Sequence, residues 1–226
     1  AFATIEMAIE QGRVIFNNIR KFIVYLLSGN VGEILAVAAA AAVGIPLPLL
    51  PLQILYLNLI NDVFPALALG VGPGGEAVMD RPPRDPDEPF LRRAHWGVIG
   101  SYGLVIAATV LGSFWIAYST YGMSEQEAVT VSFLTLSFGR LWHAFNMRDH
   151  ETTLLNNEVV KNPWMWGGFA VSLVLLAVAI WVEPLADILE VTPPSAQGWT
   201  IIAVASLIPL VAGQIYLTIR RLVGST

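Results

Sequence analysis

The sequence has 226 residues, of which 55% are hydrophobic and only 13% are charged, and its mean hydropathy is +0.64. A soluble domain of this length does not need so many apolar residues, so the composition excludes an ordinary soluble protein and indicates a membrane protein. The absence of cysteine excludes disulfides and thiolate metal sites. The acidic balance, with a net charge of −5, gives no reason to expect nucleic acid as a partner.

The N-terminal residues do not have the pattern of a signal peptide. They are polar and helical in pattern, whereas a signal peptide has a basic stub followed by a short apolar core. We expect residues 1–21 to form a cytoplasmic stalk helix that continues into the first membrane span. Apolar residues along this stalk would face a neighbouring domain; they are Ile5, Ala8, Ile9, Val14 and Ile15.

Six segments are long and apolar enough to cross a hydrocarbon layer of about 30 Å, which takes about 20 helical residues. They are residues 22–43, 52–69, 96–118, 128–145, 164–182 and 199–217. The expected fold is an all-α polytopic membrane bundle of six transmembrane helices. The first helix carries the stalk, and the last four, in residues 96–226, form a membrane support region.

The positive charges indicate how these spans are oriented. Eleven of the 12 Lys and Arg residues fall before the first span, between spans two and three, between four and five, or after the sixth. The three opposite loops carry none. By the positive-inside rule both termini are cytoplasmic. The twelfth cation, Arg140, lies inside the fourth span.

Three ionisable residues are expected near the middle of the membrane. Glu33 lies about a dozen residues from the cytoplasmic start of span one, Asp62 about ten from the outer start of span two, and Arg140 about a dozen from the outer start of span four. At a rise of about 1.5 Å per residue all three reach a similar depth and can meet. Such residues cost about 2.5–3.5 kcal/mol at mid-membrane, and they usually face a bundle interior or a water-filled path.

The residues beside these carboxylates add further oxygen atoms. Asn30 shares a helix face with Glu33, and Asn58 shares one with Asp62. Hard oxygen ligands suit Ca²⁺, Mg²⁺, Na⁺ or K⁺. Pro65 removes a helical hydrogen bond to the carbonyl of Asn61, so a partly unwound second span would expose a further ligand. Residues 22–69 are therefore predicted to form an ion-site helix pair.

Other interpretations of these residues remain open. The polar groups would also be explained if they only held helices together. Arg140 could extend to the cytoplasmic edge as a structural residue, although we favour a tethered internal counter-ion for two carboxylates. His143, one turn further, is more often a packing residue than a proton relay.

The segment 70–95 is expected to be a cytoplasmic coupling loop. It is rich in Pro, Gly and charge, and its MDRPPR stretch is stiffer than an ordinary linker. A solvated loop and a docking surface for a soluble domain are both compatible with this composition.

Three stretches in order resemble a known family. They are FATIEMAIEQGRVIFNNIRKFIVYLLSGNVGE, LQILYLNLINDVFPALALG and MDRPPRDPDEP, and they are similar to the C-terminal transport region of type II P-type ATPases. The likeness is greatest to calcium pumps of the sarco/endoplasmic reticulum type and to their bacterial relatives. It implies that the six spans correspond to the fifth to tenth membrane helices of such a pump.

The resemblance also implies roles for individual residues. Asn30 and Glu33 match ion ligands of the family's fifth helix, and Asn58 and Asp62 match ligands of its sixth, where Asp62 would touch every bound ion. Asn61 replaces a threonine of the two-site calcium pumps.

Arg140 stands where those two-site pumps have a glutamate. It resembles single-site bacterial pumps, which implies one Ca²⁺ exported per ATP with protons returning, in a bacterial plasma membrane. The coupling role implied for the loop falls on Asp80, Arg81 and Arg84.

The sequence lacks the DKTGT aspartyl-phosphate motif and a nucleotide-binding domain. We therefore expect that this chain cannot hydrolyse ATP alone, and that Mg²⁺ and ATP act only in a complete pump. Its expected partners are the lipid bilayer, the N-terminal membrane helices and the cytoplasmic phosphorylation domain. The alternatives are a non-enzymatic six-helix module, such as a channel, a cation-binding protein or an assembly partner, and a pump of the same family that moves Mg²⁺ or Na⁺.

Overall fold

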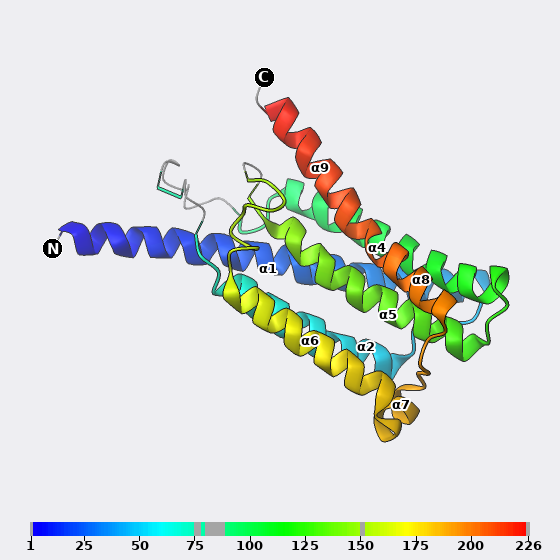
Figure 1. Ribbon diagram of the computed structural model, residues 1–226. Helices are drawn as coiled ribbons and strands as arrows, with labels where there is room; N and C mark the ends of the chain where they lie inside the picture. The colour runs from blue at the N-terminus through cyan, green and yellow to red at the C-terminus, as the bar shows by residue number, and fades with distance from the viewer. Residues whose placement is uncertain (1, 75–77, 80–88, 150–151, 225–226) are drawn as a thin grey trace.

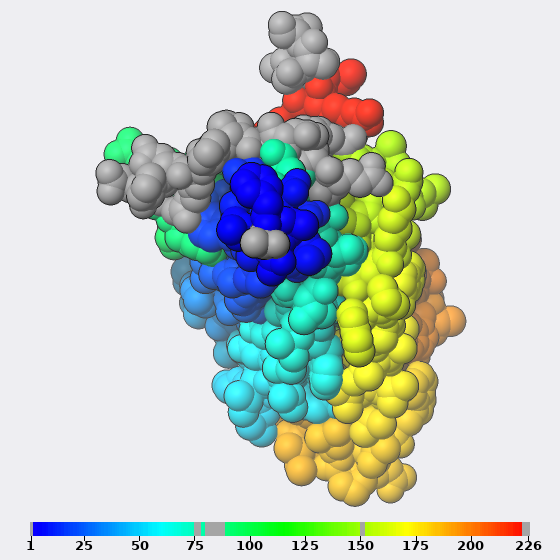
Figure 2. Space-filling view, turned by 90° about the vertical axis from the view of Figure 1, so that its left-hand side faces the viewer, coloured from blue at the N-terminus to red at the C-terminus, as the bar shows by residue number. Residues whose placement is uncertain are grey.

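The computed structural model describes residues 2–74, 78–79, 89–149 and 152–224, which form helices and connecting segments without a strand (Figure 1). The first helix, α1, runs from Phe2 to Val43 without a break. At about 1.5 Å per residue it is about 60 Å long, twice the thickness of a hydrocarbon layer. Its first turns therefore extend beyond the bundle, and they point toward the viewer in Figure 2.

The second span is built from three consecutive helical pieces. They are α2 (Pro51–Leu57), the π-helical segment η1 (Asn58–Asp62) and α3 (Phe64–Gly70). Pro51 lies in the first turn of α2, where the missing N–H costs no hydrogen bond. Pro65 lies in the first turn of α3, directly after the π-helical segment. The backbone between them forms a wider, π-helical turn. The expectation that the second span is partly unwound is therefore not confirmed.

The next two helices form an antiparallel pair. α4 (Arg93–Trp115) continues into the π-helical segment η2 (Ile116–Thr120), and α5 (Glu125–His143) ends in the 3₁₀ segment η3 (Ala144–Met147). Ser124 caps α5, because its side chain accepts a hydrogen bond from the Glu127 amide while Glu127 accepts one in return.

The last part of the chain has more elements than the sequence predicts. α6 (Pro163–Trp181) is followed by a short helix, α7 (Glu183–Leu189), which was not expected. The predicted sixth span consists of α8 (Ala196–Ser206) and α9 (Ile208–Gly224). Pro209 lies just after the break at Leu207, and its ring nitrogen cannot donate to the preceding turn.

Five of these helical stretches are long and apolar enough to cross a membrane within the described part of the chain. They are Phe2–Val43, Pro51–Gly70, Arg93–Thr120, Pro163–Trp181 and Ala196–Leu222. The helix expected as a further span, α5, is absent from this set, so the count of six is not confirmed. Fourteen of its 19 residues are buried against neighbouring helices. A helix enclosed by protein can carry polar residues without exposing them to lipid.

Small residues bring α1 and α4 close together. An added side-chain carbon on Gly32 would overlap Ile106 of α4, and one on Gly103 would overlap Val31 of α1. These two glycines therefore let the two helices approach each other directly, as small residues do in membrane bundles. This contact fixes the rotation of α1 about its axis, and with it the direction that Glu33 faces.

Candidate functional site

The site is built from three elements, α1, η1 and α5. Glu33 lies on the buried face of α1 with 3% of its surface exposed, and Asp62 lies at the end of η1 with 20% of its side chain exposed. Arg140, in the last turn of α5, is completely buried. The three ionisable residues that the sequence places at one depth therefore come from three different helices.

The guanidinium group of Arg140 joins the two carboxylates. Its Nη1 donates to Glu33 Oε1 and its Nη2 donates to Asp62 Oδ1. Nη1 also lies 3.5 Å from the amide oxygen of Asn58. Arg140 therefore connects α5 to both α1 and η1, and the structure excludes the alternative in which its side chain extends to the edge of the bundle.

A glycine on α1 makes room for this guanidinium. A side-chain carbon added to Gly29 would come within 3.0 Å of three guanidinium atoms of Arg140. Tyr25, Gly29 and Glu33 follow one another at four-residue intervals, so they form one stripe on the helix. The stripe is the sequence signal that would have identified Tyr25 and Gly29, which sequence reasoning missed.

Tyr25 satisfies the backbone group that Pro65 leaves without a partner. Because Pro65 has no N–H, the Asn61 carbonyl lacks its usual donor four residues later. The Tyr25 hydroxyl donates to this carbonyl oxygen at 3.1 Å, and both residues are completely buried. The carbonyl that the sequence indicates as a possible ligand is thus held by a side chain of α1.

Two amide oxygens near the ion pair have no hydrogen-bond partner among the described residues. They are Oδ1 of Asn30 and Oδ1 of Asn61. Asn61 instead donates from Nδ2 to the hydroxyl of Ser137 at 3.3 Å, and the Asn30 side chain interacts with Asp62. A buried oxygen without a donor is costly unless something else satisfies it, and a bound cation would do so.

The structure therefore places the predicted counter-ion Arg140 in contact with Glu33, Asn58 and Asp62. Of the other two predicted ligands, Asn30 contacts Asp62, and Asn61 contacts Ser137 and Tyr25. Their role in binding metal remains a prediction. No group of three or more His, Cys, Asp and Glu side chains in the described ranges has the arrangement of a metal site. The predicted coupling residues Asp80, Arg81 and Arg84 lie outside the residues that the structure describes.

His143 has the contacts of a packing residue. Its ring is stacked on Tyr25, with ring centroids 6.1 Å apart, and meets the Tyr102 ring edge-on at 4.2 Å. Its Nδ1 lies 3.2 Å from Nδ2 of Asn146. This ring thus packs between Tyr25 of α1 and Tyr102 of α4.

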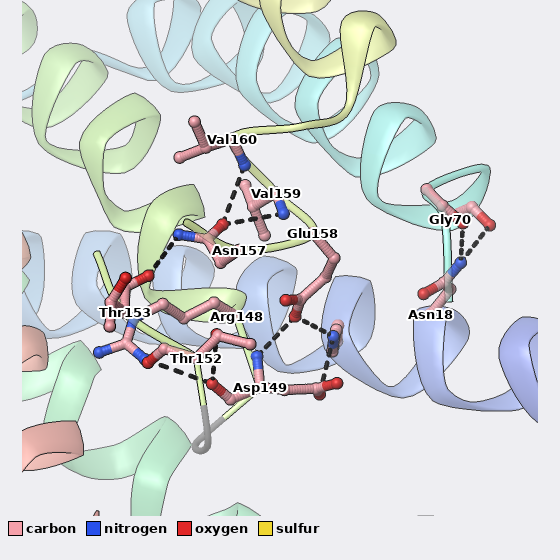
Figure 3. A network of polar contacts seen from close by, with 12 residues as sticks. Asn18, Gly70, Arg148, Asp149, Thr152, Thr153, Asn157, Glu158, Val159 and Val160 are labelled. Carbon is pink, nitrogen blue, oxygen red and sulfur yellow. Dashed lines mark hydrogen bonds and ion pairs between the residues drawn. The ribbon is translucent and has the colours of Figure 1, made fainter. Parts of the chain in front are cut away.

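A second polar network ties α1 to the segment after α5, and Figure 3 shows part of it. Lys21 of α1 forms ion pairs with Asp149 at 2.9 Å and with Glu158 at 2.6 Å. Asn18 of α1 donates to the carbonyl oxygen of Gly72 at 2.7 Å. These contacts hold the middle of α1 against the end of α3 and the segment between α5 and α6.

Comparison with known proteins identifies the class to which this fold and site belong. The family model described as "Cation transporting ATPase, C-terminus" matches residues 46–219. The chain therefore belongs to the cation-transporting ATPase family and corresponds to its C-terminal membrane region.

One relative is similar to this chain over nearly its whole length. A calcium-transporting ATPase of Bacillus subtilis (strain 168) is 40% identical over 217 residues, which cover 95% of this chain. The chain spans 24% of the length of that protein.

Proposed function

We propose that this chain forms the ion-binding segment of a Ca²⁺-transporting ATPase. The observation that carries the proposal is the Arg140 guanidinium held between the carboxylates of Glu33 and Asp62. Two carboxylates and one guanidinium leave one negative charge in a buried site. A cation balances that charge, and the oxygens of Asn30, Asn58 and Asn61 complete a hard-oxygen ligand set of the kind that Ca²⁺ prefers.

In this proposal Arg140 is a tethered counter-ion that takes the place of a second cation. Its guanidinium already occupies the space between the two carboxylates, so the site holds one transported Ca²⁺. The partly exposed side of Asp62 is where the ion and ligands from other helices of the complete pump reach the site. The calcium pump of B. subtilis that resembles this chain supports the choice of ion.

The proposal also includes the topology. We place α5 across the membrane as a sixth span, surrounded by the other helices, with both chain ends in the cytoplasm of a bacterial plasma membrane. Five of the described cations line one cavity, and such clustering at one end of the bundle is what the positive-inside rule predicts for the cytoplasmic side; they are Arg20, Lys21, Arg92, Arg148 and Arg220. The lipid bilayer, the other membrane helices and the phosphorylation domain are the partners, and ATP with Mg²⁺ acts on that domain.

The test compares ATP hydrolysis by the complete pump with and without the Asp62 charge. Asp62→Asn removes the carboxylate that Arg140 contacts, so the Ca²⁺ concentration for half-maximal stimulation should rise at least about tenfold, which corresponds to losing one charged ligand. Asp187→Asn removes an exposed carboxylate on α7 and serves as the matched control. Equal Ca²⁺ stimulation of both variants would refute the ion assignment. Stimulation by Na⁺ or Mg²⁺ in place of Ca²⁺ would identify a different transported ion.

A further inference from the structure

A cavity of about 270 Å³ lies away from the ion site, at the end of the bundle where the cations gather. It is half open, and its walls come from α1, α4, α9 and the segment that follows α5. The residue of α1 that lines the cavity nearest to Glu33 is Val24, and nine residues along a helix correspond to about 14 Å. The charged described residues that line it are Arg20, Lys21, Arg92, Arg148, Arg220 and Asp149.

The charges around this cavity favour an anion. Among the described residues that line the cavity, five are cationic and one is anionic. The anion, Asp149, already pairs with Lys21. Arg148 is 7% exposed and binds the neutral amide oxygen of Gln214 at 3.0 Å, and Arg20 binds the carbonyl oxygen of Phe90 at 3.1 Å.

Burial disfavours the charged form of one of these arginines. It lowers the pKa of Arg148 from its usual value, because removing a guanidinium from water disfavours its charged form. A phosphate oxygen close to this side chain would offset that cost by a charge-assisted hydrogen bond.

An apolar groove of about 360 Å³ continues from the cavity between α4 and α9. The two spaces share Ala94, Val98, Tyr102 and Tyr216 in their walls. Beyond them the groove extends along α4 to Val105, which is 12 residues, or about 18 Å, from the start of the helix at Arg93. This direction leads from the charged end of α4 into its membrane-spanning part.

We propose that the cavity and groove together bind one anionic phospholipid, with its phosphate among the arginines and an acyl chain along α4 and α9. Charge complementarity selects a negatively charged headgroup, and basic pockets between membrane helices are suited to such headgroups. The adjoining apolar groove favours a lipid over a free phosphate ion, because inorganic phosphate would leave the groove unused.

This lipid would act as a structural contact between helices. The cavity joins α1, which carries Glu33, to α4 and α9, so a bound headgroup connects the three elements through their arginines. The inference does not depend on which ion the pump transports, because no predicted ion ligand lines either space.

Binding can be measured by native mass spectrometry of the delipidated complete pump during titration with phosphatidylglycerol or phosphatidylcholine. We expect one phosphatidylglycerol to bind at least about tenfold more tightly than phosphatidylcholine. The double variant Arg92→Gln/Arg220→Gln should lower this affinity about tenfold or more, since each basic residue near a headgroup contributes roughly one kcal/mol. Arg13→Gln/Arg93→Gln removes two cations that do not line the cavity and should have less than about a twofold effect.

A second pair of variants tests the groove separately. Gly97 lines the groove and Gly100 does not, and an added side-chain carbon at either position meets no atom within 4 Å. Gly97→Leu should therefore weaken phosphatidylglycerol binding by filling the groove, while Gly100→Leu should not.

Three results would overturn the inference. They are equal losses in the two arginine pairs, equal binding by Gly97→Leu and Gly100→Leu, and displacement of the lipid by millimolar inorganic phosphate, which would identify a free-phosphate site. Ca²⁺ stimulation of ATP hydrolysis, measured on the same variants, separates a failure of this inference from a failure of the proposed function.

Discussion

At the scale of single residues, the site depends on how closely Arg140 fits against α1. The guanidinium is completely buried, and its two carboxylate partners come from different helices. Removing Arg140 would leave two buried carboxylates without their partner, and breaking a buried ion pair in this way costs about 3–5 kcal/mol in proteins. The triad therefore fixes the relative positions of α1, η1 and α5 as well as the charge of the site.

Gly29→Ala tests this fit. The new methyl group would overlap the guanidinium, so Arg140 must move away from Glu33 or Asp62, and we expect the Ca²⁺ affinity of the complete pump to change by at least about tenfold. Gly12→Ala, on the same helix in open space, is the control and should stabilise α1 slightly. The readout is Ca²⁺-dependent ATP hydrolysis, and identical curves for the two variants would show that Gly29 does not position Arg140.

The sequence predicts the charged residues of the site better than their neutral neighbours. Glu33, Asp62 and Arg140 stand out because ionisable residues are rare in apolar segments, and helical rise is enough to bring them to one depth. Tyr25 and Ser137 are ordinary residues of membrane helices, and only the packing of three helices makes them contacts of Asn61. Their roles depend on helix rotation, which the sequence pattern leaves open.

At the scale of elements, η1 and α1 form one unit through the hydrogen bond from Tyr25 to the Asn61 carbonyl. Pro65 makes this carbonyl available, and the π-helical turn places Asn58 and Asp62 on the side that faces Arg140. A wider turn within an α-helix is a frequent feature of functional sites. The geometry of η1 is therefore part of the proposed ion site.

A double-mutant cycle measures the energetic coupling between Tyr25 and Pro65. Tyr25→Phe should destabilise the complete pump by about 1–3 kcal/mol, because the buried Asn61 carbonyl loses its donor. In a Pro65→Ala background the restored N–H can donate instead, so the same substitution should cost less. Thermal unfolding in detergent gives both values, and an equal cost in the two backgrounds would show that Tyr25 and Pro65 act independently.

The hydrogen bonds at the start of α5 predict a contribution to stability that depends on pH. Hydrogen bonds from the backbone N–H and the hydroxyl of Ser124, at 2.9 and 2.8 Å, lower the pKa of Glu127 below its usual value. A lowered pKa in the folded state stabilises the protein above the unfolded pKa, and this contribution is lost as the pH falls below about 4.

Glu127→Ala should therefore lower the unfolding temperature at pH 7 and should have a smaller effect near pH 4. Glu125→Ala, in the same first turn, does not break the cap and is the control. Unfolding temperatures measured across this pH range test the idea, which fails if both variants show the same pH dependence. Ser124→Ala should cost about 1 kcal/mol at pH 7.

The elements themselves are only partly predictable. Long apolar runs identify five spans, since hydropathy is decisive where a helix faces lipid. It is less informative for α5, whose Ser132, Thr135 and Ser137 are buried among other helices. The short α7 is not apparent from hydropathy either, because Glu183 and Asp187 interrupt its apolar pattern.

At the scale of the whole molecule, α1 links the two polar regions of the protein. Lys21 forms an ion pair with the segment after α5, while Glu33, about three turns further along, forms one with Arg140 in the proposed ion site. Because α1 is one continuous helix, a movement of its first turns would be transmitted to Glu33. The orientation expected from the cations and the continuity of α1 are the two large-scale features that the sequence indicates most directly, whereas the packing of α8 and α9 around α5 requires the structure.

The most direct test of the central claim is equilibrium binding of ⁴⁵Ca²⁺ to the purified complete pump. The account predicts one Ca²⁺ per pump, with binding weakened at least about tenfold by Glu33→Gln and by Asp62→Asn and unchanged by Asp187→Asn. Two bound ions per pump, or undiminished binding after both substitutions at Glu33 and Asp62, would contradict it.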